Sequence, residues 1–316
     1  MSSASLSPDS EIGGGLWYPR QRRQFQVMAV NEMTDRQGRT LKPSLATETE
    51  LASVLERVRA FAIDMDGVLY RGDTVLPHVN DFLDVLNDLV FPYVLATNNS
   101  TRLPEQYVQK LAAMGVEVTS DRIQTSGQAT AAYLKDRYTS GTSVYVLGMT
   151  ALETAVYGDG YFLQAGKDAQ VVVCGADFAV TYEKLRIATL AIRRGAAFVA
   201  TNGDTTFPTE EGLIPGAGAI LAALVAATSV EPDVVGKPST GMLFQGAAFL
   251  GSEPANTVML GDRLDTDILA GRRAGFITIM VLTGVSTMEE VQSSDIQPDV
   301  LLPDLSPMVA YYRSHS

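Results

Sequence analysis

Three aspartates follow apolar runs of the chain and could carry out chemistry together. Asp64 comes directly after the run 61–63, Asp66 comes two residues later, and Asp262 follows the run 257–261. Carboxylates that gather at the carboxyl ends of parallel strands repel one another unless a cation lies among them. Oxygen ligands without histidine or cysteine favour Mg²⁺. These residues therefore predict a Mg²⁺ site made by the Asp64 side chain, the Asp66 carbonyl and the Asp262 side chain.

Three other residues have the chemistry that binds a phosphoryl group. Thr97 and Asn98 end another apolar run, and they offer a hydroxyl, an amide and a backbone N–H to phosphoryl oxygens. Lys237 lies in the short segment GKPS (236–239) before a helical stretch. Its ammonium is a point charge that can hold a phosphoryl group beside a nucleophile. A phosphate monoester dianion fits this set, because the metal and Lys237 offset its charge.

The two leading aspartates suggest a reaction. Asp64 can attack the phosphorus in line, and water can then hydrolyse the aspartyl-phosphate. Asp66 can act first as the acid and then as the base. For Asp66 to carry a proton near neutral pH, its pKa must be raised; crowding with other carboxylates raises it, whereas a metal ion opposes the shift.

The elements that must position these residues alternate between apolar runs and helical stretches. The runs contain Val, Ile or Tyr, and most end in Gly, Asn or Asp. Strands buried on both faces that alternate with helices predict an α/β fold with a parallel sheet. The expected strands are 61–64, 93–98, 144–148, 171–175, 197–202, 257–262 and 278–284, and the expected helices are 79–90, 105–114, 128–137, 182–194, 217–227, 241–250 and 267–274.

Length and composition narrow the functional classes. The chain has 316 residues, which predicts two domains or one large one. Its net charge of −12 disfavours binding to nucleic acid and to anionic membranes. The uncharged run 212–230 contains Pro215 and several small residues, so we expect a buried helix there and no membrane span.

The scarcity of cysteine and histidine excludes further classes. Cys174 is the single cysteine, which rules out an intrachain disulfide and fits a reducing compartment, so we expect a cytoplasmic protein. With only His78 and His315 besides it, the chain cannot build a usual structural zinc site. A Ser-His-Asp or Cys-His hydrolase would depend on His78, which has no nucleophile motif nearby.

Four motifs, in order, resemble a known family. DMDGVLYRG (64–72), TNNST (97–101), GKPS (236–239) and GDRLDTDI (261–268) are similar to the motifs of haloacid dehalogenase (HAD) superfamily phosphatases, in the NagD-like or para-nitrophenylphosphatase-like subclass. The likeness covers about residues 58–313. It implies a Rossmann-like core at 51–138 and 234–316 and an inserted α/β cap at 139–233 that determines substrate specificity. We expect residues 1–50 to be a flexible tail.

The resemblance also implies residue roles, carried over position by position. It gives Asp64 as nucleophile, Asp66 as acid/base, phosphate binding by Thr97, Asn98 and Lys237, and Mg²⁺ ligation by Asp64, Asp66 and Asp262. It adds Asp267 in support of the metal site, directly or through water, although Asp267 could instead be a helix N-cap. Asn202 and Asp204 become candidate substrate contacts, although they could form an ordinary turn. Family members commonly have proline where Gly203 stands, which bears on the rigidity of this loop.

The expected function is Mg²⁺-dependent hydrolysis of a small phosphorylated metabolite, of the sugar phosphate, glycerol phosphate, phosphoglycolate or nucleoside monophosphate type. The alternatives are a phosphate-binding or regulatory protein with little turnover and a phosphotransferase that uses the same site. Asp66 favours hydrolysis over a phosphate receiver, which needs no acid/base. Apart from Arg193-Arg194, the cap has no evident arginine cluster, which favours small monophosphates. A homodimer through the cap is plausible.

Overall fold

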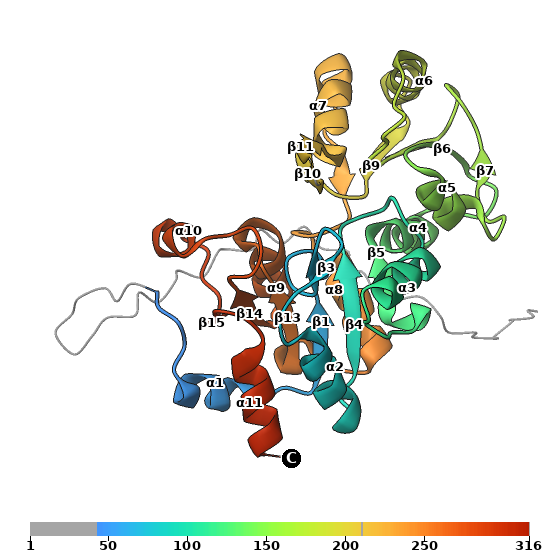
Figure 1. Ribbon diagram of the computed structural model, residues 1–316. Coiled ribbons are helices and arrows are strands. Elements are labelled where there is room, and N and C mark those ends of the chain that lie inside the picture. Colours follow the sequence, from blue (N-terminus) through green and yellow to red (C-terminus); the bar gives the residue numbers. More distant parts are fainter. Residues whose placement is uncertain (1–42, 210, 316) are drawn as a thin grey trace, which may run out of the picture. The chain divides into compact units, whose positions relative to one another are not determined.

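The computed structural model describes residues 43–209 and 211–315, and Figure 1 shows the arrangement of their helices and strands. Six parallel strands form the first large sheet, in the order β15-β14-β13-β1-β4-β5. Their bounds are β1 (Ala60–Ile63), β4 (Tyr93–Thr97), β5 (Ile123–Thr125), β13 (Thr257–Gly261), β14 (Ile277–Val281) and β15 (Val300–Leu302). The sheet joins strands from both ends of the chain, because β1 lies between β4 and β13.

Alternate residues of these strands point to opposite faces of the sheet, as expected for a period of two. Phe61 and Ile63 of β1 pack with one cluster of buried side chains, whereas Ala62 packs with another. The first cluster includes residues of α1 (Glu48–Leu55), α2 (Val79–Asp88), α3 (Pro104–Ala113) and α11 (Ser306–Ser314). The second includes residues of α8 (Gly241–Leu250) and α9 (Leu269–Ala274). Both faces are therefore covered by helices.

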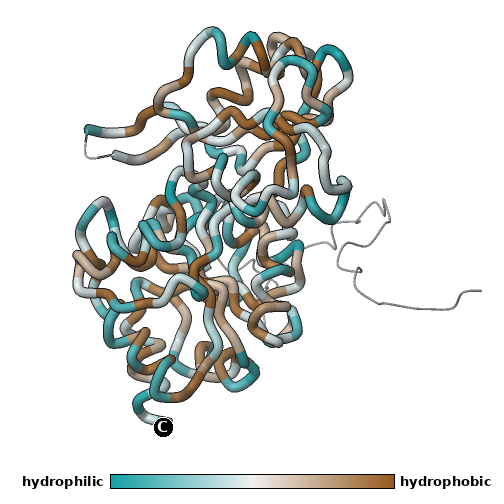
Figure 2. The backbone as a smooth tube through the Cα atoms, turned by 90° about the vertical axis from the view of Figure 1, so that its right-hand side faces the viewer, coloured by the Kyte–Doolittle hydropathy of each residue, from teal (hydrophilic) through white to brown (hydrophobic). Residues whose placement is uncertain are grey.

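A second parallel sheet has the order β12-β9-β8-β6-β7. It contains β6 (Ser143–Leu147), β7 (Leu163–Gln164), β8 (Val171–Cys174), β9 (Ala197–Ala200) and β12 (Asp233–Val234). One face packs with α6 (Tyr182–Arg193) and α7 (Ala217–Thr228), and the other packs with α4 (Ser126–Arg137) and α5 (Thr150–Tyr157). Along the chain in Figure 2, hydrophobic stretches alternate with hydrophilic ones, which is the pattern of buried strands between exposed loops.

Two antiparallel hairpins and one short helix complete the described elements that matter for the site. They are β2 (Tyr70–Arg71) with β3 (Thr74–Val75), β10 (Thr206–Thr209) with β11 (Gly212–Pro215), and α10 (Met288–Ser293). The α/β class with parallel sheets is confirmed. The strands of the first sheet fall within the predicted core ranges 51–138 and 234–316. Those of the second fall within 139–233, except that β12 reaches Val234.

The expected buried helix in the uncharged run is α7, whose inward side packs with the second sheet. Within residues 43–209 and 211–315, no helix has the length and apolar character needed to cross a membrane.

The predicted end of the tail at residue 50 lies too late in the chain. Helix α1 begins at Glu48, and Thr47 and Glu50 form a capping box at its start. The backbone N–H of Ala46 also donates to the carbonyl of Leu301 in β15, at 2.9 Å. Capping and this contact order the segment because they satisfy backbone groups that would otherwise need water. Residues 1–42 of the predicted tail lie outside the described residues.

The centre of the first core cluster gives a stability prediction. The Phe61 side chain is fully buried, and its ring makes edge contacts with Phe82, Phe91 and Tyr312. Phe61→Ala is expected to lower the free energy of unfolding by about 3–5 kcal/mol, because it leaves a cavity. Urea unfolding measures this loss. Phe249→Ala is the control, because Phe249 is 58% exposed, and its cost should stay below about 1 kcal/mol. Equal losses in the two variants would contradict the prediction.

Candidate active site

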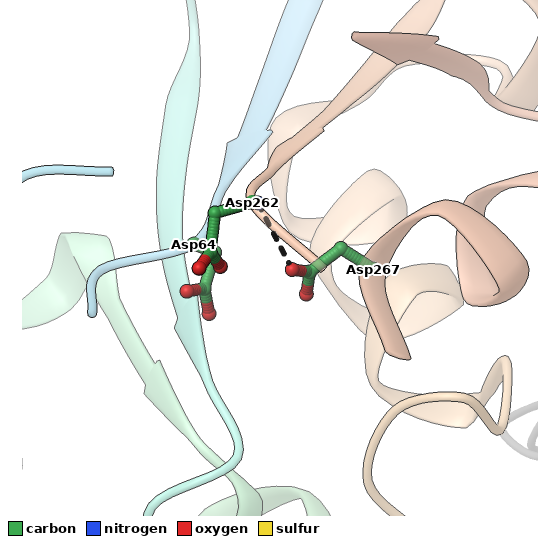
Figure 3. A group of neighbouring side chains, drawn as sticks. All are labelled: Asp64, Asp262 and Asp267. Atoms are coloured by element: carbon green, nitrogen blue, oxygen red, sulfur yellow. Dashed lines mark hydrogen bonds between the residues drawn. The ribbon is translucent and has the colours of Figure 1, made fainter. Parts of the chain in front are cut away.

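The neighbouring ends of β1 and β13 bring three carboxylates together. Asp64 directly follows β1 and Asp262 directly follows β13, and the two strands pair in parallel register. The Asp64 N–H donates to the carbonyl of Leu260 at 2.8 Å, which fixes the place where the chain leaves the sheet. Asp267 joins them from a later turn. Figure 3 shows the three side chains, which offer carboxylate oxygens within 4.8 Å of one another.

A π-helical turn, Leu264–Ile268, places Asp267. One of its oxygens, Oδ2, accepts from the backbone N–H groups of Asp262 (3.2 Å) and Arg263 (3.1 Å), and Figure 3 draws the first of these bonds. The N-cap residue of α9 is Ile268, and its side chain makes no capping hydrogen bond. The alternative that Asp267 is a helix N-cap is therefore wrong, because its carboxylate turns back toward Asp262.

One carboxylate oxygen of Asp262 accepts a hydrogen bond, and the other has no partner in the described part of the chain. Its Oδ2 accepts from the backbone N–H of Val285 at 2.6 Å, whereas its Oδ1 is buried and has no hydrogen-bond partner among the described residues. The chain passes so close that glycine is required nearby: a Cβ on Gly284 would lie 1.8 Å from Oδ2 and one on Gly67 would lie 2.4 Å from it. Gly67 also has a φ of +87°, which favours glycine.

Lys237 is buried among the carboxylates, with only 2% of its surface exposed. Its Nζ lies 2.5 Å from Oδ1 of Asp64, 2.7 Å from Oδ1 of Asp267 and 3.0 Å from the carbonyl oxygen of Ala96. The Asn98 amide holds the lysine loop in place. Its Oδ1 accepts from the Lys237 N–H at 2.8 Å, and its Nδ2 donates to the Lys237 carbonyl at 2.9 Å. The end of β4 is thus joined to the lysine loop by two hydrogen bonds.

Three buried carboxylates face a single buried ammonium. Burial raises the pKa of Asp64 well above its ordinary value; Lys237 opposes this, and Asp267 and Asp262 add to it. Burial and Asp267 raise the pKa of Asp262. Burial would lower the pKa of Lys237, but Asp267 and Asp64 together raise it. With all four groups ionised, the cluster would carry an excess of negative charge that Lys237 alone does not balance.

The donor set fits a hard divalent cation. Its side chains offer only carboxylate oxygens, and the buried Oδ1 of Asp262 has no protein partner. Such oxygen ligands suit Mg²⁺ better than zinc or copper, which favour nitrogen and sulfur. A cation would offset the charge that burial otherwise makes unfavourable.

Asp66 lies beside this cluster and is partly buried. The Tyr70 hydroxyl donates to its Oδ2 at 3.3 Å, and the Gly67 N–H donates to the Tyr70 carbonyl, which closes the turn. Burial raises the pKa of Asp66, while Lys110 opposes this shift. Met65, between the two aspartates, is fully buried in the apolar core and points away from them.

The two candidate substrate contacts in 139–233 make hydrogen bonds within the protein. Nδ2 of Asn202 donates to the carbonyl of Asn98 at 2.7 Å, and Oδ1 of Asn202 accepts from the Asp204 N–H at 3.1 Å. The second bond is the ordinary turn that was the alternative, so the turn is present. Nδ2 of Asn98 also donates to Oδ2 of Asp204 at 3.2 Å. Both residues therefore connect the loop after β9 to the end of β4.

One cavity of about 220 Å³ brings all the predicted side chains together. The nine predicted residues that line it are Asp64, Asp66, Thr97, Asn98, Asn202, Asp204, Lys237, Asp262 and Asp267. Sequence reasoning missed Arg263, Phe207 and Leu213, which also line it. The position of Arg263 directly after Asp262 was an available signal; the two apolar residues lie on the β10–β11 hairpin, and only the fold places them there.

Comparisons with known proteins agree with the fold and show the family. The family model described as haloacid dehalogenase-like hydrolase matches residues 61–162, and one described as HAD-hydrolase-like matches residues 234–308. An acid sugar phosphatase of Staphylococcus epidermidis is 40% identical over 256 residues, covering 81% of this chain and 98% of that protein.

Two solved structures extend the comparison. NagD from Escherichia coli K-12 superposes with a TM-score of 0.74 at 31% identity, covering 79% of this chain and 97% of NagD. A glycerol phosphate phosphatase from Mycobacterium tuberculosis, solved in complex with magnesium, gives a TM-score of 0.73 at 30% identity, covering 81% of this chain and 77% of that one. The chain belongs to the HAD superfamily. Within it, the chain is a NagD-like phosphoric monoester hydrolase.

The tight approach of the chain to Asp262 gives a prediction. Gly284→Ala should displace the Asp262 carboxylate and break its bond to the Val285 N–H, because the added Cβ overlaps Oδ2. We expect a loss of about 1–3 kcal/mol in the free energy of unfolding, measured by urea denaturation. Gly166→Ala is the control, since nothing lies within 4 Å of a Cβ there. A Gly284→Ala protein as stable as the control variant would refute the account of this contact.

Proposed function

We propose that this chain is a Mg²⁺-dependent phosphatase that hydrolyses small phosphate monoesters through an aspartyl-phosphate on Asp64. The observation that carries the proposal is the cavity in which Asp64, Asp66 and the buried Lys237 meet a cluster of carboxylates that fits a divalent cation. The names of the relatives, an acid sugar phosphatase and a glycerol phosphate phosphatase, support sugar phosphates or glycerol phosphate as the substrate type.

The carboxylates of Asp64 and Asp262 and the carbonyl of Asp66 would hold Mg²⁺, with Asp267 in support. When bound, the ion would offset the charge of the phosphate dianion and so reduce its repulsion from the carboxylates. Lys237 offsets further charge, because its ammonium already contacts an oxygen of Asp64 at 2.5 Å. A phosphate dianion bound beside this oxygen would contact the proposed nucleophile and the Lys237 ammonium together.

The two chemical steps use Asp64 and Asp66. In the first, an Asp64 oxygen forms a bond to phosphorus while the bond from phosphorus to the leaving oxygen breaks, and Asp66 gives that oxygen its proton. In the second, water attacks the phosphorus, Asp66 takes a proton from the water, and the bond to Asp64 breaks. Inorganic phosphate leaves, and Asp64 and Asp66 return to their starting states.

Thr97 and Asn98 complete the phosphate site in this proposal. Both are buried, and both line the cavity at the end of β4. The amide of Asn98 is occupied by the Lys237 backbone and Asp204, so it positions the lysine, and we assign its backbone N–H to the phosphoryl oxygens. The Thr97 hydroxyl accepts from the Asn99 N–H at 3.1 Å, which leaves its own proton for a phosphoryl oxygen.

We propose a cytoplasmic location, supported by the single, buried cysteine, which suits a reducing compartment. A homodimer through residues 139–233 stays a proposal as well; Phe178, Val180 and Tyr182 are exposed apolar side chains that could form such an interface. The acidic chain should not bind nucleic acid or anionic membranes.

Removal of the nucleophile should abolish turnover. Asp64→Asn keeps the shape of the side chain but cannot form the aspartyl-phosphate, so release of phosphate from para-nitrophenyl phosphate should fall by at least about a thousandfold. Asp84→Asn, an exposed aspartate on α2, is the matched control and should keep the wild-type rate. An Asp64→Asn rate equal to wild type would exclude the mechanism. If wild type retains bound phosphate without turnover, or passes it to an alcohol instead of water, the binding or phosphotransferase alternative holds.

Removal of the cation should stop turnover, and its binding should be measurable without turnover. EDTA is expected to abolish phosphate release and excess Mg²⁺ to restore it. Mg²⁺ at one hundred times its Kd should stabilise the folded chain by about 2.7 kcal/mol, seen as a higher midpoint of thermal unfolding. Asp262→Asn should lose this shift, while Asp84→Asn should retain it. A shift that survives in Asp262→Asn would place the cation elsewhere.

A further inference from the structure

A second cavity, of about 630 Å³, adjoins the first. The two cavities share four lining residues, and one of them is Asp66. In the proposed reaction Asp66 protonates the leaving oxygen, so the side chain that marks the border between the cavities also marks where the leaving group begins. The second cavity is therefore the space next to the leaving group.

Basic side chains line this second cavity. Arg71 comes from the β2–β3 hairpin, Arg102 from the loop after β4, and Lys110 from α3. Its acidic lining residues are Asp66, at the border, and Asp73. Three cations against two carboxylates give this lining an excess of positive charge, although the net charge of the chain is −12. A concentration of positive charge in a cavity of an acidic protein is typical of an anion site.

Lys110 is largely buried, and its one ion pair with a described residue is long. Its side chain is 16% exposed, and its Nζ is 3.8 Å from Oδ1 of Asp73, whose own side chain is 77% exposed. The ammonium stands over the face of the Tyr70 ring, 3.9 Å from the centroid. Burial lowers the pKa of Lys110, and the charge of Arg102 adds to that effect, whereas Asp66 and Asp73 oppose it. The ammonium thus has donors left for an anion that enters the cavity.

The two arginines differ in the hydrogen bonds that they already make within the protein. Nη2 of Arg71 donates to the carbonyl oxygens of Thr283 (2.5 Å) and Gly284 (3.3 Å), which fastens the hairpin to the loop after β14. Arg102 is exposed, and no hydrogen bond or ion pair joins it to another described residue. Arg102 and Lys110 are therefore the two cations that can turn to a ligand.

We propose that Arg102 and Lys110 form a subsite for a second anionic group, a carboxylate or a phosphate, carried by the leaving group of the substrate. This inference rests on the proposed phosphatase function and names its substrate class: phosphate monoesters with a second negative charge on the alcohol side. It differs from the expectation drawn from the sequence, where the lack of an arginine cluster in 139–233 favoured small monophosphates. Both cations lie outside that range, on the loop and helix that follow β4.

A purely internal role for Lys110 makes a different prediction. If Lys110 served only to offset the charge of Asp66, its removal would slow every substrate equally, because every substrate uses Asp66. An anion subsite instead changes the ratio between a charged and an uncharged leaving group. Arg102 is exposed and makes no hydrogen bond or ion pair with a described residue; its charge also lowers the pKa of Asp66, but that effect would likewise be common to every substrate.

The test compares matched substrates in the full chain with Mg²⁺. Glycerol 3-phosphate and 3-phosphoglycerate differ only in a hydroxymethyl group against a carboxylate. Fructose 6-phosphate and fructose 1,6-bisphosphate test a second phosphate in the same way. Wild type should have the higher kcat/KM for the charged member of at least one pair, and the responding pair distinguishes carboxylate from phosphate. Para-nitrophenyl phosphate reports phosphatase activity that needs no second anion.

In Arg102→Gln, the kcat/KM ratio of the charged to the uncharged member should fall about tenfold, the loss expected for one charge-assisted hydrogen bond. Lys110→Met, which keeps the alkyl packing on Tyr70, should lower the same ratio. Arg57→Gln, an exposed arginine before the amino end of β1, removes the same charge elsewhere and should keep the wild-type ratio.

The outcomes separate the two proposals. A wild type that hydrolyses para-nitrophenyl phosphate but has no preference for either charged member overturns the subsite alone. A preference that survives in both Arg102→Gln and Lys110→Met also overturns it. If Lys110→Met unfolds, Arg102→Gln alone still tests the subsite, because Arg102 is exposed. A pure, folded wild type that releases phosphate from none of the five substrates overturns the phosphatase function, and the subsite with it.

Discussion

The ammonium of Lys237, buried among carboxylates at the ends of the strands, is the interaction on which the rest of the site depends. Asp64 and Asp267 both contact it, and without it their charges would face each other in a region with little water. Burying a lysine this deeply is unfavourable unless its donors are satisfied, and here two carboxylates and the Ala96 carbonyl satisfy them. The pairing therefore fixes both the proposed nucleophile, Asp64, and the Lys237 ammonium before a substrate arrives, which is the preorganisation that phosphoryl transfer needs.

The pairing of Lys237 with the carboxylates requires contacts that hold the lysine loop in place. Lys237 comes from a loop far along the sequence, and the Asn98 amide holds that loop by bonding both the N–H and the carbonyl of Lys237. The same Asn98 contacts Asn202 and Asp204, which lie in the loop after β9. One residue at the end of β4 thus connects the lysine loop with a loop of the second sheet. A displacement of Asn98 would disturb the proposed phosphate site and the two candidate substrate contacts together.

The sequence was informative where chemistry coincides with a local signal and uninformative where only the fold brings residues together. Apolar runs that end in polar residues located β1, β4 and β13, and so the convergence of Asp64, Thr97 and Asp262, because parallel strands expose their carboxyl ends at one edge. The short helices α1 and α10 and the strand β15 went unnoticed, since their apolar patterns span too few residues to show a period.

The same difference between a local signal and a contact made only by the fold applies to individual residues. Asp267 stayed ambiguous because its position before a helix suits an N-cap as well as a site residue; only the hydrogen bonds from Asp262 and Arg263, made in a π-helical turn, decide between them. Arg102 and Lys110 gave no signal because neither directly follows a strand, and their shared cavity depends on how α3 packs beside the β2–β3 hairpin.

The proposed subsite would also resolve a conflict between the charge of the whole chain and that of its ligand. A net charge of −12 repels anions at long range, yet at physiological ionic strength this repulsion is screened beyond about 8 Å. Inside a cavity the nearest charges determine whether an anion is attracted. Lys237 is positive in the first cavity, and Arg102 and Lys110 are positive in the second. A substrate with a single phosphate would meet only the first of these. A substrate with two anionic groups would engage cations on both sides of Asp66, and that would align the leaving oxygen with its proton donor. In this arrangement the selection of the substrate and the placement of the reacting atoms depend on the same electrostatic contacts.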